Sequence, residues 1–94
     1  MIEFSAAAAK DIETILEQSL VDFGQLRTEK CYESLKRCLE LLSEHPGTGT
    51  TAERVRAGYR RFTHESHVVF YRVIQDGILV IRVLHRRMDE GGHF

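Results

Sequence analysis

The sequence lacks any long hydrophobic run, and no stretch approaches the roughly 18–20 apolar residues that a membrane-spanning helix needs. Its first residues, 1–4, show no basic segment followed by an apolar one, so we expect no signal peptide and a cytoplasmic protein. Hydrophobic residues make up 43% of the chain and charged residues 29%, a balance typical of globular proteins. With 94 residues, the chain is expected to form one domain over residues 1–94.

Cysteine is scarce, and the two that are present, Cys31 and Cys38, lie in a segment with helical spacing. Seven residues of helix separate two Cα atoms by roughly 10 Å, beyond the ~7 Å that a disulfide allows. We therefore expect two small buried apolar residues. The histidines and acidic residues show no metal-binding spacing, and the Gly-Thr-Gly-Thr run at 47–50 lacks the lysine of a phosphate-binding loop. Neither a metal site nor a cofactor is predicted.

Charge is unevenly distributed, although the net charge is only −1. Residues 1–45 hold nine acidic and five basic side chains, whereas residues 46–94 hold eight arginines and five acids. The planar guanidinium of arginine suits bidentate contacts to carboxylates or phosphates. The second half is therefore predicted to contact an acidic or anionic partner.

Two helices are predicted in the first half. Ser5 is a good N-cap before a run of alanines, and apolar residues continue at helical spacing to Phe23. Gly24 is a typical helix stop, and a second helix is expected from about Gln25 to Ser43. Because the connection is so short, the helices should pack as an antiparallel hairpin.

The other apolar segments are strand-like: Ile2–Phe4, Arg54–Thr63, Ser66–Ile74 and Ile78–His85. Asp76-Gly77 predicts a two-residue hairpin that makes the last two runs antiparallel neighbours, and residues 46–51 are expected to form an open loop. The resulting order, β-α-α-β-β-β, predicts an α+β fold in which an antiparallel sheet packs against the N-terminal helix hairpin.

Alternation along the last two strands leaves both of their faces largely apolar, and places Val80, Arg82, Leu84 and Arg86 on one face. The helix hairpin can cover one face. The other is expected to stay uncovered, unless the loop of residues 45–53 and the C-terminal tail fold over it. An uncovered apolar face with arginines at its rim is typical of a partner-binding site. The apolar residues predicted to meet a partner are Val69, Val80, Leu84, Leu26, Tyr32 and Leu39.

Three consecutive segments carry a family resemblance: Gly58–Phe62, Ser66–Arg72 and Val80–Asp89. They resemble motifs of ParE-type toxins of the RelE/ParE superfamily, as do Ser5–Ile12 and Leu41–Pro46. The resemblance implies a RelE/ParE-like fold and a toxin of a type II toxin–antitoxin system, which stabilises a plasmid or chromosome. It also implies that the toxin inhibits DNA gyrase, and that a ParD-type antitoxin neutralises it in a hetero-oligomeric complex.

RelE-type toxins, the sister branch, cut mRNA on the ribosome, and the resemblance to them is partial. Two of their cations fall on Arg60 and Arg86, and their strand arginine falls on His67, but one lysine and the C-terminal tyrosine are missing. Histidine can act as an acid or base near neutral pH. A nuclease that uses Arg60, His67, His85 and Arg86 therefore stays an alternative.

We predict a gyrase-directed toxin rather than an enzyme, with the nuclease and an inactive homologue that acts only as a binding protein as alternatives. No membrane contact and no sequence-specific nucleic-acid binding are expected. The residues predicted to face the target or the antitoxin are Arg60, Arg61, His67, Tyr71, Arg82, Arg86 and Arg87.

Overall fold

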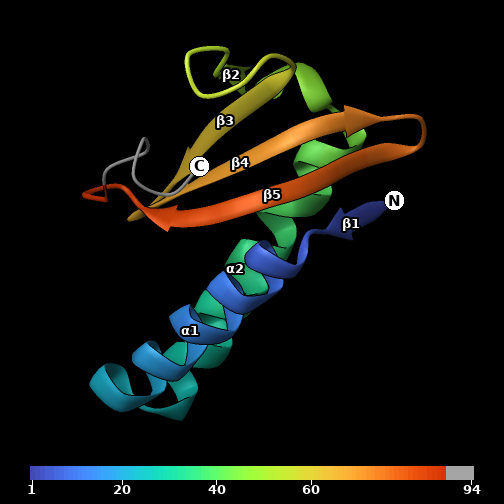
Figure 1. Cartoon of the computed structure of the whole chain (residues 1–94). Coiled ribbons are helices and arrows are strands. Elements are labelled where there is room, and N and C mark those ends of the chain that lie inside the picture. The colour runs from blue at the N-terminus through green and yellow to red at the C-terminus, as the bar shows by residue number, and fades with distance from the viewer. Residues whose placement is uncertain (89–94) are drawn as a thin grey trace.

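A computed structural model describes residues 1–88 and confirms the α+β architecture, with a helix hairpin extending away from one sheet (Figure 1). The elements are β1 (Ile2–Phe4), α1 (Ala6–Phe23), α2 (Gln25–Glu44), the 3₁₀ helix η1 (Pro46–Thr48), β2 (Thr50–Thr51), β3 (Tyr59–His64), β4 (His67–Ile74) and β5 (Gly77–His85). The strand order is β1-β5-β4-β3-β2, with β1 parallel to β5 and all other neighbours antiparallel. The prediction included neither η1 nor β2, which occupy the expected open loop.

The two predicted helices are confirmed, and their ends are set by residues close by in the sequence. The Ser5 hydroxyl accepts the Ala8 N–H at 3.0 Å and donates to the Ile81 carbonyl at 2.7 Å, so the cap also joins the start of α1 to β5. Gly24 ends α1 with φ at 82°, a left-handed conformation that favours glycine. Within residues 1–88, neither helix combines the length and apolar character needed to cross a membrane.

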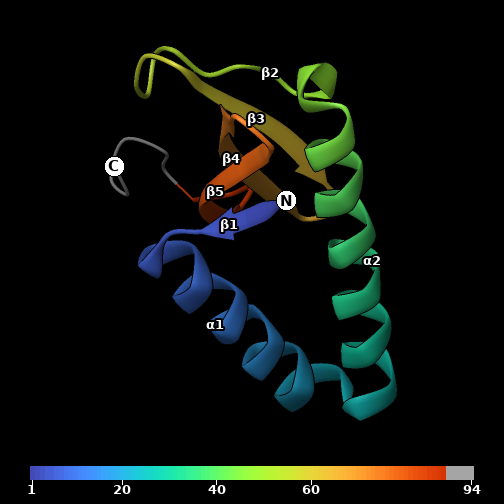
Figure 2. The ribbon, with the colours of Figure 1, turned by 90° about the vertical axis from the view of Figure 1, so that its right-hand side faces the viewer.

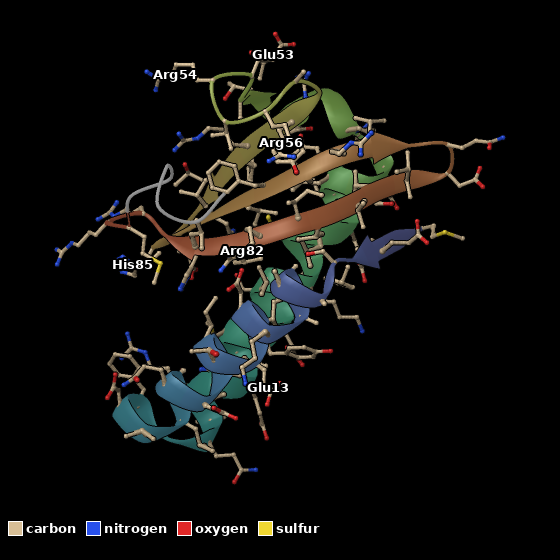
Figure 3. All side chains as sticks on the ribbon, in the orientation of Figure 1. Glu13, Glu53, Arg54, Arg56, Arg82 and His85 are labelled. Atoms are coloured by element: carbon tan, nitrogen blue, oxygen red, sulfur yellow. The ribbon has the colours of Figure 1, made fainter. Side chains whose placement is uncertain are left out.

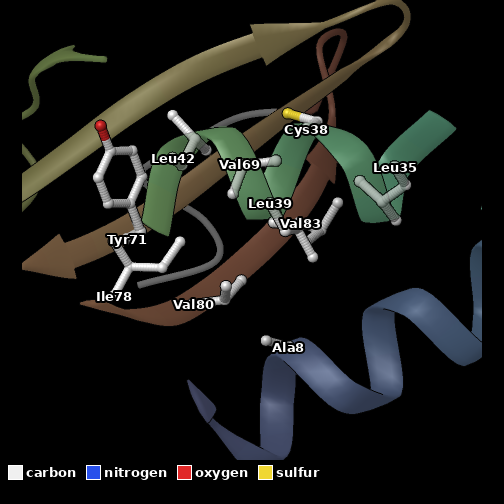
Figure 4. Close-up of a cluster of buried hydrophobic side chains, with 10 residues drawn as sticks. All are labelled: Ala8, Leu35, Cys38, Leu39, Leu42, Val69, Tyr71, Ile78, Val80 and Val83. Carbon is white, nitrogen blue, oxygen red and sulfur yellow. The ribbon is translucent and has the colours of Figure 1, made fainter. Parts of the chain in front are cut away.

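The main core lies between the helices and the sheet, and each element contributes one apolar face (Figure 4). Its buried members are Ala8, Leu35, Cys38, Leu39, Leu42, Val69, Tyr71, Ile78, Val80 and Val83. Both cysteines are free thiols, as expected; Cys38 is buried and Cys31 is half-buried. Burial raises the pKa of the Cys38 thiol to about 11, so it serves as a small apolar core residue.

A β-bulge interrupts the pairing of β4 with β5. Phe70 pairs with Arg82 and Tyr71 with Val80, so Ile81 is an extra residue on β5. The extra residue breaks the regular alternation. Val80 and Val83 therefore both belong to the main core, while Leu84 belongs to a cluster on the other face. The prediction that Val80 and Leu84 share a face is wrong for this reason.

The face of the sheet away from α2, here called the outer face, is not bare. Ala52, Val68, Phe70 and Leu84 form a second buried cluster there, and Val55, Tyr59 and Ile81 pack against it. Figure 2 shows the segment between β2 and β3 on the side of the sheet opposite α2. The expected uncovered apolar face is therefore absent, because residues 52–59 fold over it.

The β4–β5 hairpin forms as predicted, but its turn is shifted by one residue. Ile74 pairs with Gly77, so the two turn residues are Gln75 and Asp76. Gly77 has φ at 151°, and a Cβ there would collide with the backbone carbonyl of Met1. The close approach of the first residue, rather than the turn, requires this glycine.

Candidate partner-binding surfaces

Arg82, one of the predicted contact residues, forms an ion pair within the chain. Its Nε donates to Asp11 Oδ2 at 2.7 Å and its Nη2 donates to Asp11 Oδ1 at 2.8 Å. The Val83 backbone N–H also donates to Oδ2, at 3.0 Å. The hydrogen-bonded carboxylate raises the pKa of Arg82, against the effect of burial. This guanidinium joins α1 to β5 just beyond the bulge and stabilises the fold.

Tyr71 and Arg60 hold the loop that follows α2. Tyr71 is fully buried; its hydroxyl donates to the Pro46 carbonyl at 2.6 Å and accepts the Gly49 N–H at 3.0 Å. Arg60 Nη2 donates to the carbonyls of Gly47 and Gly49. The structure therefore places Tyr71 in the core rather than on the predicted contact surface, and gives Arg60 a role in the fold.

The remaining predicted arginines lie at or near the surface. The Arg61 guanidinium lies 5.6 Å from the centre of the Phe70 ring, on the outer face. Arg86 and Arg87 are exposed in the turn after β5, where the Arg86 N–H donates to the Ser66 carbonyl at 2.9 Å. Arg86 and Arg87 are thus accessible to a partner, and their side chains are not part of either core.

Three histidines form a row across β3, β4 and β5: His64 pairs with His67, and His67 pairs with His85. The rings of His67 and His85 meet edge to face with their centres 5.6 Å apart, and His64 Nε2 lies 2.9 Å from Ser34 Oγ. Burial lowers the pKa of His67, His85 lowers it further, Glu65 opposes the shift, and His64 adds to it. Within residues 1–88, no three histidine, cysteine or acidic side chains are placed to hold a metal ion.

The four residues of the nuclease alternative do not form one cluster. His67 and His85 are neighbours, and Arg86 follows directly (Figure 3 labels His85). Arg60 instead pairs with Tyr71, four residues along β4 from His67, or roughly 13 Å at the rise of a strand. Residues 89–94 lie outside the described residues. They include Asp89, the last residue of the third family-like segment, and the positions where the RelE-type tyrosine is missing.

The six apolar residues predicted to meet a partner divide by burial. Val69 and Val80 are fully buried and Leu84 is 3% exposed, so all three belong to the chain's own cores. On the helix hairpin, Leu26 is 68% exposed and Tyr32 is 49% exposed, while Leu39 is buried. Of these six residues, the apolar side chains open to a partner therefore lie on the helices rather than on the strands.

An apolar groove of about 420 Å³ lies where β1, α1 and α2 meet. Its lining residues are Ile2, Phe4, Ala9, Ile12, Tyr32, Leu35, Lys36, Leu39 and Glu40. The helices meet at their connection and diverge toward the sheet (Figure 2). A second hollow, lined by Leu16, Thr28, Glu29, Tyr32 and Glu33, continues it along the hairpin. We call the first hollow the β1–α1–α2 groove.

Sequence reasoning missed most of this groove and the Asp11 contact. Phe4 is 45% exposed although it belongs to β1, and an exposed aromatic in a three-residue strand is a signal of a binding edge. Asp11 lies three residues after the buried Ala8 and one before Ile12, on the inward side of α1. An acidic residue at an inward helix position indicates a buried cationic partner.

A family model described as the ParE toxin of the type II toxin–antitoxin system parDE matches residues 2–90. This match covers nearly the whole chain. The chain belongs to the ParE toxin family.

Two ParE toxins are close relatives over almost their full length. The chain is 41% identical over 91 residues to Toxin ParE1 of Caulobacter vibrioides, which covers 95% of this chain and 92% of that protein. It is 34% identical over 86 residues to Toxin ParE1 of Mycobacterium tuberculosis, which covers 90% and 88%. The predicted membership of a type II toxin–antitoxin family is confirmed.

The fold is similar to a chain in the solved structure of the chromosomal ParDE TA system from P. aeruginosa. The TM-score is 0.75 at 20% identity, over 89% of this chain and 92% of that one. This likeness confirms the predicted RelE/ParE-like fold.

Proposed function

We propose that this ParE family member inhibits DNA gyrase, and thereby replication, in the cytoplasm, and that a ParD-type antitoxin neutralises it in a hetero-oligomeric complex. Family membership supports the toxin role, and the structural neighbour is described as a ParDE system. The separation of Arg60 from the His67–His85 pair favours a binding protein over a nuclease. Gyrase as the target follows from the resemblance to ParE-type toxins.

The β1–α1–α2 groove is the proposed antitoxin site, and its apolar lining is the observation that carries the proposal. An amphipathic segment commonly binds by laying its apolar face into such a groove. Tyr32 is a large half-exposed aromatic at the edge of the groove, a residue type enriched among the energetically dominant residues of interfaces. Lys36 and Glu40, one turn apart on α2, offer a charge of each sign to the polar rim of the bound segment.

Expression of the chain without its antitoxin tests the activity. We expect growth arrest with filamentation, and inhibition of gyrase supercoiling by the purified protein. Ribosome-dependent mRNA cleavage with unaffected gyrase would contradict the proposal in favour of the nuclease. Normal growth together with retained antitoxin binding would identify an inactive homologue.

Tyr32→Ala and Leu26→Ala form a matched pair for the antitoxin site. Both residues are exposed and apolar on α2, but only Tyr32 lines the groove. We expect Tyr32→Ala to weaken antitoxin binding about tenfold or more, and Leu26→Ala to change it by less than about threefold. The reverse order would place the antitoxin at the tip of the hairpin, around the exposed Leu20, Val21, Phe23 and Leu26.

A further inference from the structure

The outer face of the sheet carries a group of arginines, here called the outer arginines: Arg54, Arg56, Arg61 and Arg72. Arg61 pairs with Phe70 and Arg72 pairs with Tyr59 across the strands. Phe70 belongs to the second buried cluster, on the outer face, and Tyr59 packs against it. Directly opposed side chains share a face, so Arg61 and Arg72 lie on the outer face.

Arg54 and Arg56 flank Val55, which packs on the same cluster. They belong to the segment that covers the outer face (Figure 3). Glu53 is the only acidic residue of the covering segment 52–59. The outer face therefore carries a local surplus of positive charge on an apolar base.

Arg54, Arg56 and Arg72 are exposed. Among residues 1–88, none of the three forms a salt bridge or side-chain hydrogen bond, in contrast to Arg60 and Arg82, which are held by the chain itself. A mainly solvated arginine contributes little to folding. Their concentration on one face, beside half-buried Val55, Tyr59 and Ile81, is instead the arrangement of an interface in which guanidinium groups surround an apolar centre.

Charge separates this face from the rest of the molecule. Residues 6–44, the two helices and their connection, carry eight acidic and five basic side chains, whereas residues 46–88 carry eight arginines and three acids. The β1–α1–α2 groove lies on the helix side of the sheet and the outer arginines lie on the opposite side. A segment bound in the groove therefore leaves the outer arginines accessible.

We propose that the outer arginines are a docking surface for an acidic surface of the target protein, separate from the antitoxin groove. A guanidinium fork binds a carboxylate in a bidentate manner, and complementary charge speeds association. A nucleic acid fits less well, because four arginines neutralise few phosphates and so release few counterions, and the acidic helix hairpin would repel a duplex. This proposal rests on the proposed function, since it presumes a protein target.

Charge reversal of the three exposed members tests the surface: Arg54→Glu, Arg56→Glu and Arg72→Glu in one chain. The matched control reverses three exposed cations on the helices, outside the groove: Lys10→Glu, Lys30→Glu and Arg37→Glu. Both variants change the net charge equally. Affinity for purified gyrase, inhibition of supercoiling, affinity for the antitoxin and thermal unfolding are measured for each. If the triple reversal unfolds, the milder Arg→Gln triple replaces it.

We expect the Arg54→Glu, Arg56→Glu, Arg72→Glu variant, here called the outer triple, to lose affinity for the target by about 30-fold or more. Its affinity for the antitoxin, and the affinities of the control variant, should change by less than about threefold. Raising the salt concentration should weaken target binding by the wild type but not by the outer triple. An outer triple that inhibits gyrase like the wild type would overturn the surface alone. A wild type that does not inhibit gyrase would overturn the proposed function as well. If the wild type binds a random-sequence 30-base-pair duplex and the outer triple does not, the proposed protein partner would be wrong and the surface would bind nucleic acid.

Discussion

Asp11→Ala is expected to destabilise the fold strongly, because one carboxylate joins α1 to β5 through three hydrogen bonds. Two come from Arg82, at 2.7 and 2.8 Å, and one from the Val83 backbone N–H at 3.0 Å. The side chains are mostly buried, with 12% of Asp11 and 21% of Arg82 exposed. Removing the carboxylate therefore takes the Asp11 hydrogen bonds away from a partly buried guanidinium and from a backbone N–H.

The expected cost is about 3 kcal/mol in the free energy of unfolding. A hydrogen bond to a charged group contributes about 1.5–3 kcal/mol, and removing one partner of a buried ion pair costs about 3–5 kcal/mol. Because some of the Arg82 side chain reaches water, the lower end applies. Domains of this size are stable by roughly 5–15 kcal/mol, so the variant should still fold.

Urea denaturation followed by circular dichroism measures this cost. Glu13→Ala is the control, since Glu13 is an exposed acid on the same helix (Figure 3), and we expect it to change stability by less than about 0.5 kcal/mol. Arg82→Met should be costly in the wild type and nearly neutral in the Asp11→Ala background, because the two side chains are coupled. A loss below about 1 kcal/mol for Asp11→Ala would place the pair among ordinary surface ion pairs and refute this reasoning.

Three further predictions concern other parts of the fold. Gly49→Ala should lower the melting temperature, because its Cβ would collide with the Tyr71 hydroxyl, whereas Gly47→Ala, which meets open space, should be nearly neutral in the same thermal scan. Stability should fall as the pH drops below about 6.5, because the pKa of His67 is lower in the folded chain than in the unfolded one, so that protonation favours unfolding. The urea midpoint should therefore fall less steeply between about pH 7 and pH 5 in His67→Asn than in the wild type, and an equal slope in both would contradict this. Arg86→Ala should reduce toxicity in a growth assay without changing the melting temperature, since the side chain is exposed, and unchanged toxicity would remove Arg86 from the contact residues.

The helices could be predicted from sequence because their ends depend on neighbouring residues. Ser5 caps an N–H three residues away, and Gly24 supplies a left-handed conformation that other residues adopt at a cost. The strands could also be located, because β-branched and aromatic runs are local signals. The exception is the start of β3, which was predicted at Arg54 but lies at Tyr59, because the residues before it turn over the outer face. None of these features requires knowledge of what packs against them.

The faces of the strands could not be assigned in the same way. The bulge at Ile81 coincides with two contacts from distant residues, the Ser5 hydroxyl on the Ile81 carbonyl and Asp11 on Arg82 and Val83. A one-residue insertion in the pairing exchanges the two faces for all residues beyond it. Alternation alone therefore wrongly assigned Val80 and Leu84 to the same face.

The cover on the outer face had a weak sequence signal. Ala52 and Val55 are apolar residues three apart in a segment that also holds Glu53, Arg54 and Arg56. Their spacing fits a turn that presents two small side chains to one surface, and in the structure the Val55 N–H donates to the Ala52 carbonyl at 3.0 Å. Such a short signal gains meaning only when an uncovered sheet face is known to lie beside it.

The arginines of the second half show what a charge count cannot resolve. Eight cations in residues 46–94 indicate an anionic partner, yet Arg82 is neutralised by Asp11 and Arg60 binds loop carbonyls. Both were predicted to face a partner, whereas the exposed Arg54, Arg56 and Arg72 were not among the residues expected to do so. Loss of toxicity after replacing Arg60 or Arg82 would therefore reflect unfolding as readily as lost binding. Only a substitution that leaves the melting temperature unchanged, as expected on the outer face, can assign a cation to the target.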